Sequence, residues 1–209
     1  MSGLIAALAL VAMLTVGMAG ASAGDDGATL ATISRQLVRS QVLRADFHQE
    51  KVMRALKRPL VTEGQLIFVE GRGVLWQVIA PYAVRVLVKA DEIVEWEEGA
   101  SPRRMALGTN PIFRALSHVF LAALAGNVAA LGEQFDVQAA LEGGGWQLKL
   151  APKDPTLASV FSVVQVDGGQ FIETVRIAEV SGDQTTIRFG GFKAGSGGLD
   201  DAETAYFAY

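Results

Sequence analysis

The sequence has 209 residues, no cysteine and a formal net charge of −4 at pH 7, and 50% of its residues are hydrophobic. The absence of cysteine excludes disulfides, thiol nucleophiles, zinc–thiolate sites and the lipid-anchored lipoproteins, whose anchor is attached to a cysteine. The negative net charge argues against a nucleic-acid partner.

The N-terminal segment over 1–23 has the pattern of a secretory signal peptide. An apolar run over 4–18 is followed by a small-residue cleavage site of the A-x-A type at 21–23. The run is shorter than the roughly 20 apolar residues of a membrane span. We therefore expect cleavage before Gly24 and export to the periplasm, with a retained membrane anchor as the alternative. Residues 24–209 are long enough for a single domain with its own core.

The first half of the exported chain is predicted to contain one helix and then strands. Residues 25–40 place apolar side chains at helical spacing. Residues 44–53 alternate instead, so that Phe47, Gln49 and Lys51 share one side. Short runs separated by turn residues predict further strands of an antiparallel meander. These runs are 61–69, 73–79, 84–89 and 93–97.

A second amphipathic helix is predicted in the middle of the chain. Asn110 is a suitable N-cap, Pro111 fits the first helical position, and Gly126 ends the helix. The apolar stripe consists of Ile112, Leu116, Val119, Phe120 and Ala123, flanked by Phe113 and Leu124, and the polar side of Arg114, Ser117 and His118. Strands resume over 134–140, 146–150, 157–167, 171–180 and 185–189.

The pattern of many strands and two helices is typical of a curved antiparallel sheet that helices cover on one face. The hairpin over 68–78 is unusual, because apolar residues occupy both of its faces. We expect these side chains to point into a lumen. The alternative is that they fill an ordinary core.

No group of residues in the sequence suggests an active site, a metal site or a cofactor. His48 and His118 are far apart and lack other ligands at metal-binding spacing. Nucleophile elbows, phosphate loops and dinucleotide fingerprints do not occur. The basic stretch 44–58 and the acidic stretch 91–98 are typical of solvated loops and strand faces, with a docking role as the alternative.

Several motifs, in their order along the chain, resemble the family of periplasmic outer-membrane lipoprotein carriers (LolA). ADFHQEKV resembles the first strand of that family. EGQLIFVEGRGVLWQVIAP resembles a glycine-led strand, a turn and a tryptophan-bearing strand that ends at a proline, here Gly64, Trp76 and Pro81. LVKADEIVEW resembles a strand, a turn and a second tryptophan-bearing strand, TNPIFRAL the start of the central helix, and GDQTTIRF and YF the last strands.

The resemblance implies an α+β, mostly β fold. It would be an unclosed antiparallel β-barrel of about ten to eleven strands with a helical lid over a hydrophobic cavity. It also implies a non-enzymatic monomer without cofactor. Such a protein carries the acyl chains of lipoproteins, or of another lipid, from an inner-membrane exporter to an outer-membrane acceptor. The alternatives are an interaction or assembly module that binds a protein through a sheet edge, and a lipid-acting hydrolase.

The resemblance also directs attention to apolar residues of the strands and the central helix as the cavity wall. The family keeps an arginine–proline pair before its tryptophan-bearing strand, and the arginine latches the lid. Here those two positions are Glu70 and Gly71, so Arg72 is the candidate latch, donating to carbonyls at the end of a lid helix. The alternative is a solvated arginine at a hairpin tip. The candidate cavity residues are Leu66, Phe68, Trp76, Val86, Trp96, Phe113, Leu116, Phe120 and Phe161.

Overall fold

The computed structural model describes residues 26–109, 111–195 and 197–209. The predicted signal peptide, its cleavage site before Gly24 and the predicted N-cap Asn110 lie outside these residues. None of the helices in the described part has the length and apolar character needed to cross a membrane.

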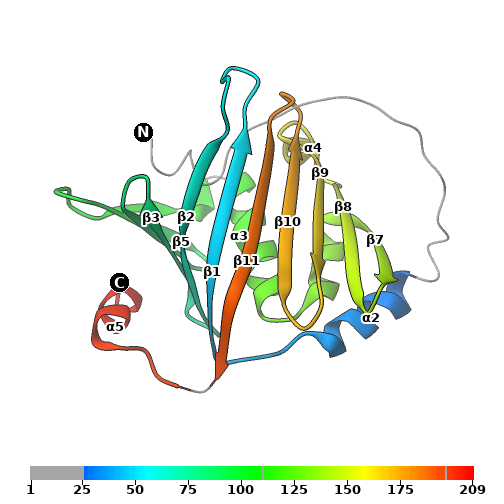
Figure 1. Ribbon diagram of the computed structural model, residues 1–209, viewed down its shortest axis with the longest axis horizontal. Helices are drawn as coiled ribbons and strands as arrows, with labels where there is room; N and C mark the ends of the chain where they lie inside the picture. Colours follow the sequence, from blue (N-terminus) through cyan, green and yellow to red (C-terminus); the bar gives the residue numbers. More distant parts are fainter. Residues whose placement is uncertain (1–25, 110, 196) are drawn as a thin grey trace.

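One antiparallel sheet of eleven strands dominates the fold (Figure 1), in the order β6-β5-β4-β3-β2-β1-β11-β10-β9-β8-β7. β1 joins two meanders, because it pairs with β2 on one side and with β11 on the other. β6 and β7 lie at the two edges, so the described sheet is not closed. The predicted fold class, an unclosed and mostly β barrel, is therefore confirmed. The strands are β1 (Val42–Val52), β2 (Leu60–Val69), β3 (Gly73–Ala80), β4 (Val84–Val88), β5 (Glu92–Glu97), β6 (Arg103–Ala106), β7 (Phe135–Glu142), β8 (Gly145–Pro152), β9 (Phe161–Gly168), β10 (Ile172–Glu179) and β11 (Gln184–Gly195).

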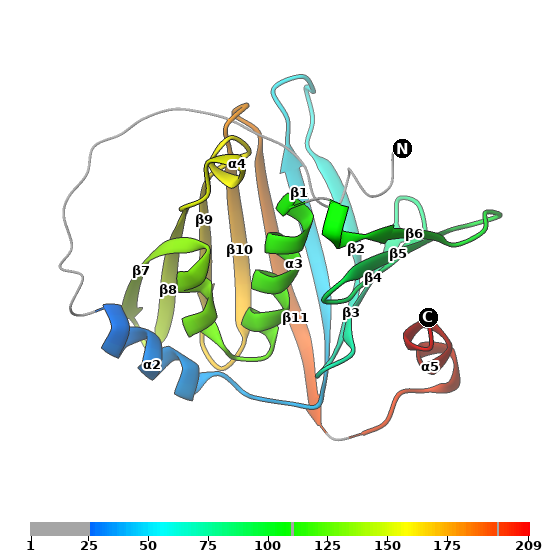
Figure 2. The same ribbon diagram turned by 180° about the vertical axis from the view of Figure 1, so that it is seen from behind.

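Helices cover both faces of this sheet. Figure 2 shows α2 (Asp26–Gln36) and α3 (Pro111–Leu124) in front of the strands, on what we call the inner face. The short helices η1 (Leu107–Thr109) and η2 (Val128–Glu133) precede and follow α3. α5 (Asp201–Phe207) covers the opposite, outer face beside β3 and β5. Apolar residues are therefore needed on both sides of the strands that α5 covers.

The hairpin of β2 and β3 supplies side chains to two separate cores. On the inner face, Phe68 and Trp76 join a cluster with residues of β1, β4, β5 and β11. On the outer face, Val69 and Leu75 pack beneath Phe207 of α5. The expectation that all these apolar side chains point into a lumen is therefore wrong, since Val69 and Leu75 lie under a helix that the sequence did not predict.

A second inner cluster lies at the other end of the sheet. Ile33 of α2 is fully buried there, and Leu37 follows it one turn later. Both pack on η2 and on the inner sides of β7, β8 and β9, whose buried members are Val128, Leu131, Phe135, Trp146, Leu148, Leu150 and Val166. The apolar spacing that predicted the first helix is the spacing that buries it here.

The C-terminal segment forms α5 instead of a last strand, so the assignment of the YF dipeptide to a strand is wrong. Asp200 accepts a hydrogen bond from the backbone N–H of Glu203 at 2.7 Å, and the Glu203 side chain accepts one from the N–H of Asp200 at 2.9 Å. This reciprocal capping box satisfies two backbone donors that the first helical turn would otherwise leave unpaired. It stabilises a helix of only seven residues.

Two other short elements also depart from the sequence expectations. Residues 157 and 158 were expected to begin a strand, but they complete α4 (Pro155–Ala158). The Asp154 carboxylate accepts hydrogen bonds from the N–H groups of Thr156 and Leu157, which lower the pKa of Asp154 and start this turn. β6 was not predicted, because its sequence RRMA has only four residues, two of which are arginines of the kind found on exposed edge strands.

Candidate functional site

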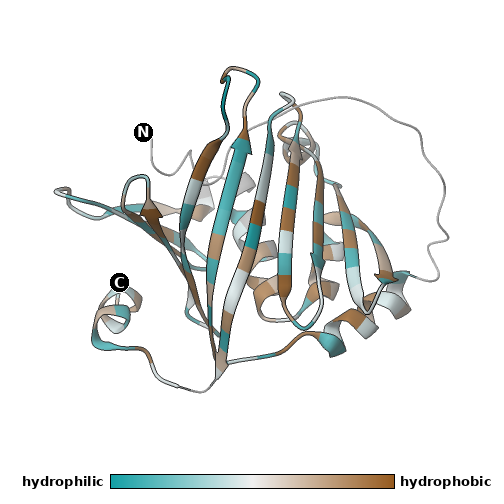
Figure 3. Cartoon of the chain, viewed as in Figure 1, coloured by the Kyte–Doolittle hydropathy of each residue, from teal (hydrophilic) through white to brown (hydrophobic). Residues whose placement is uncertain are grey.

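A cavity of about 190 Å³ lies between the inner face of the sheet and the helices α3 and η2. Side chains from β3, β4 and β7 to β11 form its floor, and Phe120, Ala123 and Leu124 of α3 form part of its roof. The floor is apolar because side chains alternate along each strand, as the bands of brown and teal on β10 and β11 show (Figure 3). Ser117, Glu179 and Thr185 are the polar residues among those that line the cavity.

An aromatic cluster forms the wall of the cavity below α3. The Trp76 ring stacks on Phe47 with ring centroids 4.0 Å apart, and it meets the edge of Phe189 at 6.0 Å and the ring of Phe120 at 6.1 Å. Gly64 allows this stack, because a Cβ there would lie 2.7 Å from Phe47 and 1.9 Å from a backbone oxygen of β3. Gly64 and Trp76, which belong to a motif that resembles the LolA family, thus contribute to the same aromatic stack.

The opposite end of the cavity is polar. Lys51 Nζ lies 3.1 Å from Glu179 Oε1, and both side chains are almost fully buried. Thr185, which pairs with Lys51 across β1 and β11, and Gln49 are buried beside them. No cluster of three metal-ligating side chains occurs among the described residues. The site can therefore hold hydrocarbon along most of its length and a polar group at one end.

Four of the candidate cavity residues line the cavity: Trp76, Val86, Phe120 and Phe161. Leu66 and Phe68 belong to the adjoining inner core, where they are 1% and 3% exposed. The side chains of Phe113 and Leu116 lie outside the part of the chain that the structure describes.

Trp96 lies on the outer face, so its assignment to the cavity is corrected. Ile93 of β5 points to the inner core, and the period of two then turns Val94 and Trp96 outward. The Trp96 ring meets the rings of Tyr206 and Tyr209 edge-on at 5.1 and 5.2 Å. It is part of the outer core beneath the C-terminal segment.

The comparison with known families agrees with this geometry. Residues 20–207 match the family described as "Outer membrane lipoprotein carrier protein LolA-like". The chain belongs to this family. No curated protein matches the sequence significantly.

Solved structures with the LolA-like fold are distant in sequence. A DUF1329 family protein from Desulfovibrio piger ATCC 29098 is 14% identical, with a TM-score of 0.50 over 88% of this chain and 96% of that one. A LolA superfamily protein from Nitrosomonas europaea is 11% identical, with a TM-score of 0.45 over 85% of this chain and 96% of that one. Likeness at such identities concerns the fold alone.

The structure places Arg72, the candidate lid latch, against α5 and not against α3. Its Nη2 donates a hydrogen bond of 3.1 Å to the carbonyl of Phe207, and its guanidinium lies 5.3 Å from the centroid of the Phe207 ring. The expected chemistry, an arginine that donates to a carbonyl at a helix end, is present. The helix is the one on the outer face of this LolA-like chain.

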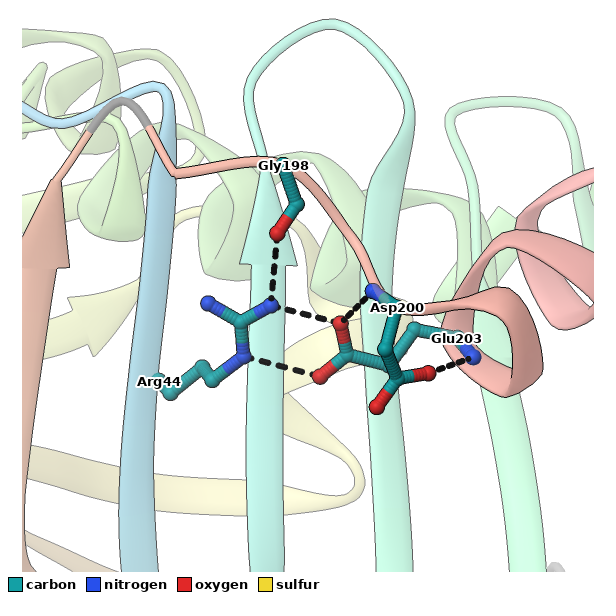
Figure 4. A network of polar contacts seen from close by, with 4 residues as sticks. All are labelled: Arg44, Gly198, Asp200 and Glu203. Carbon is teal, nitrogen blue, oxygen red and sulfur yellow. Dashed lines mark hydrogen bonds and ion pairs between the residues drawn. The ribbon is translucent and has the colours of Figure 1, made fainter.

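An ion pair fastens the other end of α5 to the sheet (Figure 4). Arg44 of β1 reaches both oxygens of Glu203, at 2.8 Å from Nε and 2.5 Å from Nη2, and also the carbonyl of Gly198 at 3.2 Å. The hydrogen bond from Arg44 lowers the pKa of Glu203, and the backbone N–H of Asp200 acts in the same direction against the effect of burial. The same hydrogen bond raises the pKa of Arg44. Bidentate arginine–carboxylate pairs hold both orientation and distance.

The acidic stretch 91–98, for which a docking role was the alternative, is largely engaged within the protein. Glu92 pairs with Lys89 at 2.9 Å and with Arg104 at 3.3 Å, and the Lys89 hydrogen bond lowers the pKa of Glu92. Arg103 pairs with Glu95 at 2.6 Å and with Glu97 at 3.1 Å. These pairs tie β4, β5 and β6 together.

Phe161 was the one candidate on the C-terminal strands, and sequence reasoning missed the other residues that these strands give to the cavity. Trp146, Leu148 and Leu150 line it from β8, and Val164 and Val166 line it from β9. The signal was present, because apolar residues at every second position of 146–150 mark one face of a strand. The buried Glu179 had no such signal, since a glutamate near a strand end is usually solvated.

Proposed function

We propose that this protein is a periplasmic, non-enzymatic carrier. It takes the acyl chains of a lipoprotein or of another lipid into the cavity and moves them from the inner to the outer membrane. The observation that supports this proposal is the apolar cavity between the inner face of the sheet and α3. Membership in the LolA-like family favours the same function.

The cavity fits the energetics of a carrier. Each methylene of an acyl chain in water costs about 0.8 kcal/mol relative to an apolar environment. A wall of apolar side chains offsets this cost without fixing the position of the chain, since hydrophobic contact has no preferred direction. A carrier that must also release its load is served by such contacts.

Loading requires α3 to move. The cavity of about 190 Å³ is smaller than the roughly 300–1,000 Å³ of pockets that enclose drug-sized ligands. Phe120, Ala123 and Leu124 meet the cavity from α3 through apolar atoms, so lipid can replace their contacts with the sheet. In this proposal α3 is the lid, and outward displacement of α3 makes room for the chains.

Native mass spectrometry of the protein purified from the periplasm of its own cells tests the proposal. We expect an adduct whose mass identifies an acylated peptide or another lipid. The same spectrum should give a protein mass that begins at Gly24, because the A-x-A site precedes it.

Other results would favour the other functions. A protein that is empty and also fails to bind an uncharged apolar fluorescent probe would overturn the carrier and favour a protein-interaction module. Release of free fatty acid from bound ester with repeated turnover would favour a hydrolase. A mass that retains the N-terminal apolar run would indicate a membrane-anchored protein.

A further inference from the structure

The polar end of the cavity is built from buried groups on three neighbouring strands. Gln49 and Lys51 lie on β1, Thr185 on β11 and Glu179 at the end of β10, and each residue is 3–6% exposed. The ends of these strands lie together at one end of the sheet (Figure 1). Of these four residues, Glu179 and Thr185 line the cavity. A buried cluster of four polar residues is costly unless its hydrogen bonds are complete.

The Glu179 carboxylate of this cluster has an oxygen without a hydrogen-bond partner among the described residues. Glu179 Oε1 accepts a hydrogen bond from Lys51 Nζ at 3.1 Å and a longer one from the Thr185 hydroxyl at 3.5 Å. Glu179 Oε2 is buried and has no hydrogen-bond partner within the described residues. The Glu179 side chain is 2% exposed, and the residue lines the cavity. A residue that lines the cavity thus carries an acceptor whose hydrogen bonds are incomplete.

Charge balance limits what can bind there. Lys51 already neutralises the Glu179 carboxylate, so a cationic ligand would add an uncompensated charge to a buried site. An anionic ligand would meet a carboxylate oxygen and be repelled. A neutral N–H or O–H group completes the hydrogen bonds of Glu179 without changing the net charge.

We propose that Glu179 Oε2, held in place by Lys51 and Thr185, is a subsite that accepts a hydrogen bond from a neutral amide or hydroxyl group attached to the acyl chain of the cargo. The apolar wall formed by Phe161, Ile177 and Ile187 adjoins Glu179 and holds the chain next to that group. The subsite gives the cargo one fixed end in a cavity that otherwise selects only for hydrocarbon. This inference rests on the proposed function and adds a preference among lipids to it.

Three probes with the same hydrocarbon chain test the subsite: oleamide, which has a neutral N–H donor, methyl oleate, which has none, and oleylamine, which is cationic. Their affinities are measured by displacement of an uncharged apolar fluorescent probe from the delipidated protein. We expect oleamide to bind about tenfold or more tightly than methyl oleate, because hydrogen bonds to charged groups are stronger than neutral ones.

The variant for this test replaces both members of the buried pair, Lys51→Met with Glu179→Leu. Removal of the pair together avoids the unpaired buried charge that either single substitution would leave. The ratio between oleamide and methyl oleate should fall close to one. The matched control is Lys89→Met with Glu92→Leu, which removes a Lys–Glu pair of similar length at the β4–β5 turn and should keep the wild-type ratio.

The outcomes separate this inference from the proposed function. If oleamide and methyl oleate bind equally well to the wild type, the carrier stands and the subsite is overturned. A preference that survives in the double variant places the hydrogen bond elsewhere and also overturns the subsite. Tighter binding of oleylamine than of oleamide overturns the neutral-donor class. If none of the three probes binds, the proposed function fails and the subsite fails with it.

Discussion

The inner and outer faces of the sheet are both apolar and both covered by a helix, but the two helices are held differently. Among the described side chains of α3, Phe120, Ala123 and Leu124 meet the cavity through hydrocarbon and Ser117 is the polar one. α5 is held by the Arg44–Glu203 pair and by three arginines that lie over its aromatic rings and those just after it. The described side chains of α3 thus meet the cavity mainly through nondirectional contacts, whereas those of α5 make contacts with a fixed geometry.

This difference indicates which helix can move. Apolar contacts tolerate sliding, and lipid can replace them at little cost. Bidentate ion pairs and cation–π contacts weaken as soon as distance or angle changes. We therefore expect α3 to be the mobile lid and α5 to be a fixed part of the scaffold, and four substitutions can break or sharpen that contrast.

The largest effect should come from Phe207→Ala on the outer face. Phe207 is 6% exposed and packs on Val69, Leu75 and Leu87. Its loss should lower the free energy of unfolding by about 3 kcal/mol, as for other large-to-small core substitutions. Urea denaturation measures this change. Binding of a fluorescent fatty acid per folded molecule should stay at the wild-type level, and a several-fold loss of binding would show that the two faces are coupled.

Glu203→Gln should lower the free energy of unfolding by about 2 kcal/mol at neutral pH, the size of a hydrogen bond to a charged group. The control is Glu63→Gln, whose side chain is 62% exposed and whose pair with His48 should contribute little. Denaturant midpoints of both variants and the wild type give the comparison. Equal losses in the two variants would contradict a special role of the Arg44 pair.

Acidification should remove the contribution of the Arg44–Glu203 pair to the free energy of unfolding. The pKa of Glu203 is lower in the folded protein than its ordinary value of 4.5, so the stabilisation is complete above that value and is lost as pH falls through the folded-state pKa. The difference in unfolding free energy between the wild type and Glu203→Gln should therefore shrink on acidification. A difference that stays constant with pH would contradict the ion pair as its source.

Phe120→Asp tests whether α3, the helix over the inner face, contributes to lipid binding. An aspartate at this position puts a carboxylate on the apolar wall, so affinity for the fluorescent fatty acid should fall about tenfold, which corresponds to 1.4 kcal/mol. Arg114→Asp, on the exposed side of the same helix, is the matched control and should bind as the wild type does. A loss of stability with unchanged binding per folded molecule would make Phe120 an ordinary core residue.

The smallest effect is expected for Arg72→Leu, which removes one hydrogen bond and one cation–π contact at a partly exposed site. The free energy of unfolding should fall by about 0.5–1 kcal/mol, as it should for Arg85→Leu, whose guanidinium lies over Tyr206. Transfer of bound lipid to liposomes should proceed at the wild-type rate. A several-fold change in transfer for Arg72→Leu alone would mean that it acts as a latch after all.

The contrast between the faces also explains what could be predicted from the sequence. Alternating strands such as Gly73–Ala80 and the amphipathic central helix have strong periodicity, and both were predicted. α5 was missed because seven residues carry too few periodic positions, although the capping residues Asp200 and Glu203 mark its start. Without α5, the outward turn of Trp96 had no explanation, so Trp96 was assigned to the cavity.

The pairing of β1 with β11 determines when the sheet of this protein can be completed during folding. On one edge β1 pairs with β2, which follows it directly in the sequence. On its other edge β1 pairs with β11, near the C-terminal end of the described strands, with Val42 opposite Gly195. Contacts between such distant segments are slow to form, because a long loop must close first. Because a chain is synthesised from its N-terminus, β1 would present an open edge to other chains until the last strand has been made. Loss of β11 would then leave two half-sheets, each with an unpaired strand edge exposed to aggregation.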